Sequence, residues 1–308
     1  MKLLALASLV LAFVVVVAGA YVRLSDAGLG CPDWPLCYGR ALPGEMTDGN
    51  ALAKAWKEMG HRYLAGALGL LILLLAVIAW SRRRSRWLAT AIVALTAFQA
   101  TLGAWTVTML LKPAIVTAHL LGGMGILALL AWFCLSQLDY ESRAQARRLR
   151  VPAATALAVL AVQIALGGWV SANYAALACP DLPLCLGAAL PPMDFGNAFH
   201  VVRELGQAAD GTLLEREALT AIHWTHRVFA LVVSFVVAWL AFKAYSVTKA
   251  LSAAIAGLLV LQFSLGLANV AFGLPLALAA AHNAGAALLL ISLVVLNFFA
   301  FRGLRPSR

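Results

Sequence analysis

The residues best suited to chemistry are histidines in strongly apolar surroundings. Four of the 6 histidines lie near the start of long apolar segments, namely His61, His119, His226 and His282. A single histidine inside a membrane usually makes a hydrogen bond between helices. Paired imidazoles without a thiolate or carboxylate to complete a tetrahedron suit instead the two axial positions of a haem iron. The expected pairs are His61 with His119 and His226 with His282.

Charged residues beside two of these histidines extend the chemistry. Arg62 follows His61 and Arg227 follows His226. We expect these guanidinium groups to pair with the carboxylates of a haem, and reaching toward the membrane surface is the alternative. Glu58 precedes His61 by three residues, where a carboxylate at a haem edge can accept a proton or stabilise positive charge. A glutamate favoured by the helix dipole is the simpler interpretation.

Small residues follow two of the histidines, in HLLGG after position 119 and HNAGA after position 282. They leave room for a flat macrocycle against the backbone. Close helix packing explains them equally well.

Two short polar loops repeat one cysteine pattern. The first, GCPDWPLCYG, holds Cys31 and Cys37, and the second, ACPDLPLCLG, holds Cys179 and Cys185. A disulfide that closes each loop is the simplest interpretation. A redox-active thiol pair, as in membrane thiol oxidoreductases, stays open. A zinc site is disfavoured, because no histidine lies beside the cysteines at ligand spacing.

The composition places these residues in a membrane. Hydrophobic side chains make up 63% of the 308 residues and charged ones 12%, whereas about a quarter of an ordinary soluble domain is charged. Apolar runs of roughly 20 residues can cross a bilayer. The sequence therefore predicts an all-α membrane protein. Its eight expected spans are residues 3–22, 61–80, 87–111, 114–135, 151–170, 221–245, 250–272 and 276–301.

The placement of charge orients the chain. With the N-terminus in the cytoplasm, the inner segments hold most of the 23 basic residues but only Asp139 and Glu141 of the 13 acidic ones. The positive-inside rule selects this orientation. It also accounts for the net charge of +10, so we expect a lipid bilayer and no nucleic acid as partner. Both termini are predicted to be cytoplasmic, with the cysteine loops outside a bacterial inner membrane.

An internal repeat divides the chain. The segment leading into the first cysteine loop aligns with the segment leading into the second, and HRYLAGALGL aligns with HRVFALVVSF. Gln99 and Gly103 align with Gln262 and Gly266, and TAHLLGG aligns with AAHNAGA. Because each half has an even number of spans, the repeats are parallel.

The repeat predicts two pseudo-symmetric four-helix bundles side by side. Residues 1–136 form the first bundle, 137–150 a basic cytoplasmic linker, and 151–308 the second bundle. Residues 1–20 also resemble a cleavable signal peptide. Their counterpart in the fifth apolar run argues against cleavage, because a leader has no such twin.

The halves differ at one position that bears on chemistry. KEMGHR places Glu58 before His61, whereas HWTHR places His223 at the corresponding position of the second half. The first half is therefore predicted to perform chemistry and the second to hold a cofactor.

This combination resembles a known family over essentially the whole chain. A C-x5-C loop before E-x-x-H-R, then TAHLLGG, a second cysteine loop, a second H-R and a last histidine, over eight spans, is similar to the haem A synthases of the cysteine-bearing bacterial type. The resemblance implies oxidation of the C8 methyl group of haem O to a formyl group. The product, haem A, serves terminal oxidases.

The same resemblance implies a role for each matching residue. His61 and His119 hold the substrate haem, and Glu58 is the acidic catalytic residue. His226 and His282 ligate a resident haem b. His223 matches no family role that we can assign. The outer disulfides that the family implies are Cys31–Cys37 and Cys179–Cys185.

Two other functions stay open on the residues alone. A di-haem electron-transfer cytochrome would use the same four histidines, and a membrane thiol oxidoreductase would use the cysteines. A net oxidation also needs an electron acceptor, and the sequence has no flavin or nucleotide fingerprint. A soluble carrier such as a ferredoxin, or a quinone, is therefore expected, and contact with the haem O synthase stays open.

Overall fold

The computed structural model describes residues 1–44, 48–142 and 144–306. Arg143 and Arg308, two of the basic residues counted on the inner side, lie outside these ranges. The described residues contain eight helices that are long and apolar enough to cross a membrane, which confirms the predicted all-α membrane fold. They are α1 (Lys2–Leu24), α2 (Gly49–Ser81), α3 (Arg86–Thr108), α4 (Pro113–Leu135), α5 (Arg150–Ala172), α7 (Arg216–Ala244), α8 (Lys249–Ala271) and α9 (Leu276–Arg302).

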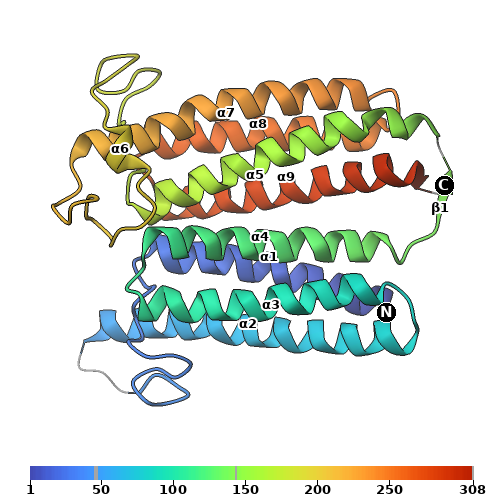
Figure 1. Cartoon of the computed structure of the whole chain (residues 1–308), viewed down its shortest axis with the longest axis horizontal. Coiled ribbons are helices and arrows are strands. Elements are labelled where there is room, and N and C mark those ends of the chain that lie inside the picture. The colour runs from blue at the N-terminus through green and yellow to red at the C-terminus, as the bar shows by residue number, and fades with distance from the viewer. Residues whose placement is uncertain (45–47, 143, 307–308) are drawn as a thin grey trace.

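The long helices form two groups of four (Figure 1). In the first group α1, α2, α3 and α4 make a closed ring, each helix packing on the next and α4 on α1. In the second group α5, α7, α8 and α9 make a ring of the same kind. The groups meet where α4 packs on α5 and α9, and where α1 packs on α9. These contacts agree with two four-helix bundles, whereas the parallel relation and the pseudo-symmetry between them stay predictions from the sequence repeat.

The two ends of the helices differ in what they carry. Both chain termini lie at one end, here called the terminus end (Figure 1). There strand β1 (Tyr140–Ser142) pairs antiparallel with strand β2 (Leu304–Pro306), and the 3-10 helix η1 (Ala144–Leu149) leads into α5. The opposite end, here called the loop end, carries the two cysteine loops, residues 30–39 and 178–187, and the short helix α6 (Phe195–Ala198).

Two helices extend farther toward the loop end than the apolar runs predict. α2 begins at Gly49 and α7 at Arg216, because their first turns are helical although too polar to count as membrane spans. The Asp48 side chain caps α2 by accepting a hydrogen bond from the Asn50 N–H (2.8 Å). His61, expected at the start of its apolar span, therefore lies about three turns inside the helix α2. This extension puts Glu58 on the helix, on the same face as His61.

The seam between the two groups is tight near the loop end. A Cβ built on Gly168 of α5 would lie 3.0 Å from Leu120 Cδ2 and 3.3 Å from Thr117 Cγ2, both on α4. Farther out, Arg23 at the end of α1 donates a hydrogen bond to the carbonyl oxygen of Ser171 at the end of α5 (2.8 Å). Cations are favoured at helix C-termini because the exposed carbonyl groups there carry partial negative charge.

The segment between the second cysteine loop and α7 packs over the loop end. Trp169 Nε1 donates to the Ala198 carbonyl oxygen (2.8 Å), and the buried Arg203 donates to Asn173 Oδ1 (2.6 Å). Lys112, between α3 and α4, forms an ion pair with Glu204 (2.7 Å). This segment therefore contacts both groups of helices.

Candidate functional site

Both cysteine loops are closed by disulfides, as the sequence predicts. The Cα atoms are 4.8 Å apart in Cys31–Cys37 and 4.6 Å apart in Cys179–Cys185. Cys134 is the free cysteine among the described residues and lies in α4. The first disulfide packs its loop against α2, because Cys31 and Cys37 are fully buried against Ala55 and Met59 of that helix.

An aspartate organises the turn of each loop. Asp33 accepts a hydrogen bond from the Gly39 N–H (2.8 Å), and Asp181 accepts one from the Gly187 N–H (2.8 Å). These backbone bonds lower the pKa of both carboxyl groups below the ordinary value, because they favour the ionised form. Gly39 and Gly187 have φ of 73° and 74°, the left-handed region in which glycine is unstrained.

Glu58 and Arg62 fasten the first loop to α2. Glu58 is 4% exposed, and its Oε2 accepts a hydrogen bond from the Cys31 N–H (2.8 Å). Its other oxygen, Oε1, accepts from Arg62 Nη2 (2.5 Å). Arg62 Nη1 donates to the carbonyl oxygens of Leu36 (2.7 Å) and Asp33 (2.9 Å). The carboxylate is thus held by two hydrogen bonds, one of them from a guanidinium group.

His223 and Arg227 fasten the second loop in the same way. His223 is also 4% exposed, and its Nδ1 accepts a hydrogen bond from the Cys179 N–H (3.2 Å). Arg227 Nη2 donates to the carbonyl oxygens of Pro183 and Leu184, each at 3.1 Å. His223, to which the sequence assigned no role, is therefore the counterpart of Glu58. The predicted pairing of Arg62 and Arg227 with haem carboxylates stays a prediction.

Replacing either cysteine of the second loop with serine is expected to lower the free energy of unfolding by about 2 kcal/mol. A disulfide around so short a ring contributes roughly this much by restricting the unfolded chain. Thermal unfolding of Cys179→Ser measures it, with Cys134→Ser as the control that should melt like the wild type. An unchanged melting temperature in Cys179→Ser would disprove the bracing role.

Each of the four candidate histidines lies against a glycine of a neighbouring helix. A Cβ built on that glycine would crowd the ring carbon Cε1 at 2.9 to 3.2 Å. The contacts are Gly19 with His61, Gly103 with His119, Gly167 with His226 and Gly266 with His282. Glycine thus provides the space for each imidazole at the backbone of α1, α3, α5 and α8.

The helices that carry each pair lie diagonally opposite in their group. In the first ring α2 carries His61 and α4 carries His119, and in the second ring α7 carries His226 and α9 carries His282. A diagonal pair of imidazoles in an apolar bundle is the arrangement that two axial haem ligands require.

The rings also offer nitrogen atoms to a ligand. Among the described residues, Nδ1 of His61, His119 and His282 is buried without a hydrogen-bond partner. A buried polar atom left unpaired costs about 1–3 kcal/mol. The same described residues hold no group of three or more His, Cys, Asp or Glu that could bind a metal ion directly. The residues therefore fit a group that brings most of its own iron ligands, as a porphyrin does.

The small residues after two of the histidines have a use that the sequence did not reveal. A Cβ on Gly122 would collide with Gln99 Oε1, and one on Gly285 would collide with Gln262 Oε1. These glycines therefore make room for a glutamine from the neighbouring helix, rather than only for a macrocycle or for close packing.

Comparison with known proteins identifies the family. The family model of the cytochrome oxidase assembly proteins (COX15-CtaA) matches residues 2–294. The chain belongs to this family. It is 42% identical over 310 residues to the heme A synthase of Shewanella oneidensis, covering 95% of this chain and 94% of the relative. It is 30% identical over 229 residues to the heme A synthase of Halalkalibacterium halodurans, covering 70% of this chain and 73% of the relative. It is 29% identical over 335 residues to the heme A synthase of Caulobacter vibrioides, covering 96% of this chain and 93% of the relative.

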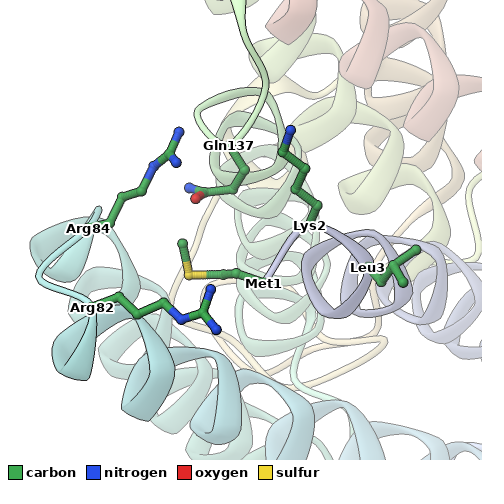
Figure 2. Close-up of a pocket in the computed structure, with 6 residues that line it drawn as sticks. All are labelled: Met1, Lys2, Leu3, Arg82, Arg84 and Gln137. Carbon is green, nitrogen blue, oxygen red and sulfur yellow. The ribbon is translucent and has the colours of Figure 1, made fainter.

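This COX15-CtaA chain also has a cavity of about 460 Å³ at the terminus end. Figure 2 shows Arg82 and Arg84 on one side of it and Lys2 on the other, with Gln137 between them. The cavity lies at the opposite end of the helices from the cysteine loops and is lined by basic groups. It is therefore separate from the histidine pairs.

Proposed function

We propose that the chain is a haem A synthase that oxidises the C8 methyl group of haem O to a formyl group. One observation carries the proposal beyond family membership. At corresponding buried positions beside the two cysteine loops, the first half presents the carboxylate of Glu58 and the second the imidazole of His223. The two halves share their loops and their histidine pairs, so this difference favours chemistry in the first half.

The first half would hold the substrate. His61 and His119 would bind the iron of haem O from diagonal helices, with their rings against Gly19 and Gly103. Haem supplies the redox-active iron and the methyl group that is oxidised. Arg62 has donors beyond those used on the loop, since a guanidinium carries five N–H groups, and would pair with a haem carboxylate.

Glu58 would be the catalytic acid-base group of this site. It stands one helical turn from His61, buried and oriented by the Cys31 N–H and Arg62. A carboxylate held in this way stabilises positive charge that develops at a neighbouring reacting carbon, and accepts a proton as that carbon is oxidised.

The second half would hold a resident haem b between His226 and His282, with Arg227 near its carboxylates. Both rings lie in apolar surroundings against glycine, as in the first half. The proposed ligands rest on the diagonal pairing and on the unpaired nitrogen of His282, whereas the identity of the haem as haem b rests on the family resemblance.

The proposed function also implies a location and partners for the protein. The protein would lie in a bacterial inner membrane with both termini in the cytoplasm, because the basic residues gather at the terminus end. Oxidation of the methyl group releases electrons, so an acceptor such as a ferredoxin or a quinone is required. The haem O synthase that supplies the substrate is a further candidate partner.

Co-expression with a source of haem O tests this function. Cells that make the protein should accumulate a haem with a formyl group, identified by chromatography and mass spectrometry of extracted pigment. Bis-histidine haem bands without the formyl product would instead indicate a di-haem cytochrome. Absence of haem from the purified protein would exclude both haem functions and would favour the membrane thiol oxidoreductase.

A further inference from the structure

A glutamine stands one helical turn before the glycine in three of the four histidine contacts. On the helix surface, residues four apart are neighbours on one face. The glutamine–glycine pairs are Gln99 and Gly103 on α3, Gln163 and Gly167 on α5, and Gln262 and Gly266 on α8. On α1 the same position before Gly19 is occupied by Val15.

The two glutamines of the second half contact imidazole rings. Gln163 Nε2 lies 3.2 Å from His226 Nδ1 and donates to the His226 carbonyl oxygen at 3.1 Å. Gln262 Nε2 lies 3.3 Å from His282 Nε2. Each ring of the proposed resident-haem site therefore has a glutamine amide at one of its nitrogen atoms, while Nδ1 of His282 has no partner among the described residues.

The first half lacks such ring contacts. Gln99 Nε2 donates to the backbone carbonyl oxygen of His119 (2.7 Å) and leaves Nδ1 of that ring without a partner among the described residues. His61 faces α1, where Val15 offers no polar group, and its Nδ1 is likewise unpaired within the described ranges.

A second hydrogen bond matters to a histidine that binds metal. One ring nitrogen binds the metal, the other carries the proton, and the partner of that N–H fixes the ring and raises its basicity. An amide can face a ring nitrogen with or without a proton, because it has both a donor and an acceptor atom. The acceptor, Oε1 of Gln163 and of Gln262, is buried without a partner among the described residues. A half-turn of the amide presents this oxygen to a ring N–H, and in Gln163 it gives up the bond from Nε2 to the His226 carbonyl oxygen.

We propose that Gln163 and Gln262 are positioning residues that fix His226 and His282 for a haem that stays, while the first half leaves its rings unassisted so that haem can exchange. The inference rests on the proposed function. A cofactor must be retained through turnover, whereas a product must leave. The second half, which would retain its haem, has a glutamine at each ring, and the first half, which would release its haem, has none among the described residues.

Reduction potential and haem retention of the purified full-length protein test this proposal. Gln163→Met and Gln262→Met keep the size of the side chain but remove the acceptor. They should raise the potential of the second-half haem, because a less basic imidazole stabilises ferric iron less. They should also weaken haem retention by roughly 10–100-fold, measured as transfer to apomyoglobin. Gln163→Glu keeps an acceptor oxygen and should shift the potential downward.

Gln99→Met is the matched control, since Gln99 contacts a backbone carbonyl and no ring. It should leave the potential and retention of the second-half haem unchanged. Opposite shifts in Gln163→Met and Gln163→Glu cannot arise from a loss of packing alone. If Gln163→Met fails to fold, a lower reduction potential of the second-half haem in Gln163→Glu supports the proposal, and an unchanged potential contradicts it. Wild-type potential and retention in the variants would overturn the inference, whereas wild-type protein without bis-histidine haem would overturn the proposed function itself.

Discussion

Replacing Glu58 with histidine is expected to lower haem A formation by roughly 10²–10⁴-fold, the usual contribution of a positioned acid-base group. The variant copies the second half, where His223 Nδ1 accepts from the Cys179 N–H. The Cys31 N–H therefore keeps an acceptor and the first loop stays in place, while the carboxylate is lost. The measurement is the ratio of haem A to haem O in membranes from cells supplied with haem O.

Two further variants separate charge from position. Glu58→Gln keeps the size and the hydrogen-bond acceptor, and should lose haem A formation to a similar degree. His223→Glu changes the corresponding site of the second half and should leave the conversion within a few-fold of wild type. Wild-type conversion by Glu58→His would limit Glu58 to fastening the loop.

Replacing His282 with alanine is expected to remove the resident haem from the purified protein. The variant loses an axial ligand of the iron. The helix α9 contains no second histidine that could replace it. The bis-histidine absorption bands of the second-half haem should disappear, and haem A formation with them. The pyridine haemochrome assay gives the haem content per chain.

The companion variants localise the effect. His61→Ala should lose binding of haem O but keep the spectrum of the resident haem, because His61 belongs to the other helix group. His200→Ala, in the segment that packs over the loop end, should retain both. Equal haem loss in His61→Ala and His282→Ala would contradict two independent sites.

The sequence was sufficient for the spans, the disulfide pairing and the family. These features depend on local composition and on motifs with fixed spacing, such as C-x5-C before E-x-x-H-R. The start of α2 was misplaced because its first turns are helical but polar, and an apolar-run criterion counts hydrophobic residues and not hydrogen-bonded turns. The cap by Asp48 was the available signal.

The contacts across helices were not predictable in the same way. The alignment of Gln99 with Gln262 was visible in the sequence, but which atom each amide touches depends on the rotation of one helix against the next. The same holds for His223, whose alignment with Glu58 was visible in the sequence, whereas the hydrogen bond that each accepts from a cysteine N–H was not. The spacing of four residues between Gln163 and Gly167 is the same as that between Gln99 and Gly103, and this shared spacing could have indicated a similar contact.

The close contact at Gly168 joins α4, which carries one ligand of the proposed substrate site, to α5, which packs against the proposed resident-haem site. His119 is placed between Thr117 and Leu120, the α4 residues that touch Gly168, while the adjacent Gly167 supports His226 on the other side of α5. A side chain added at Gly168 would push α4 and α5 apart, and would therefore displace a helix beside each of the two proposed haem sites. Electrons passing between the two proposed haem sites would cross only this single helix boundary, so the proposed substrate oxidation and cofactor reduction would be neighbours in space although 107 residues separate His119 from His226 along the chain.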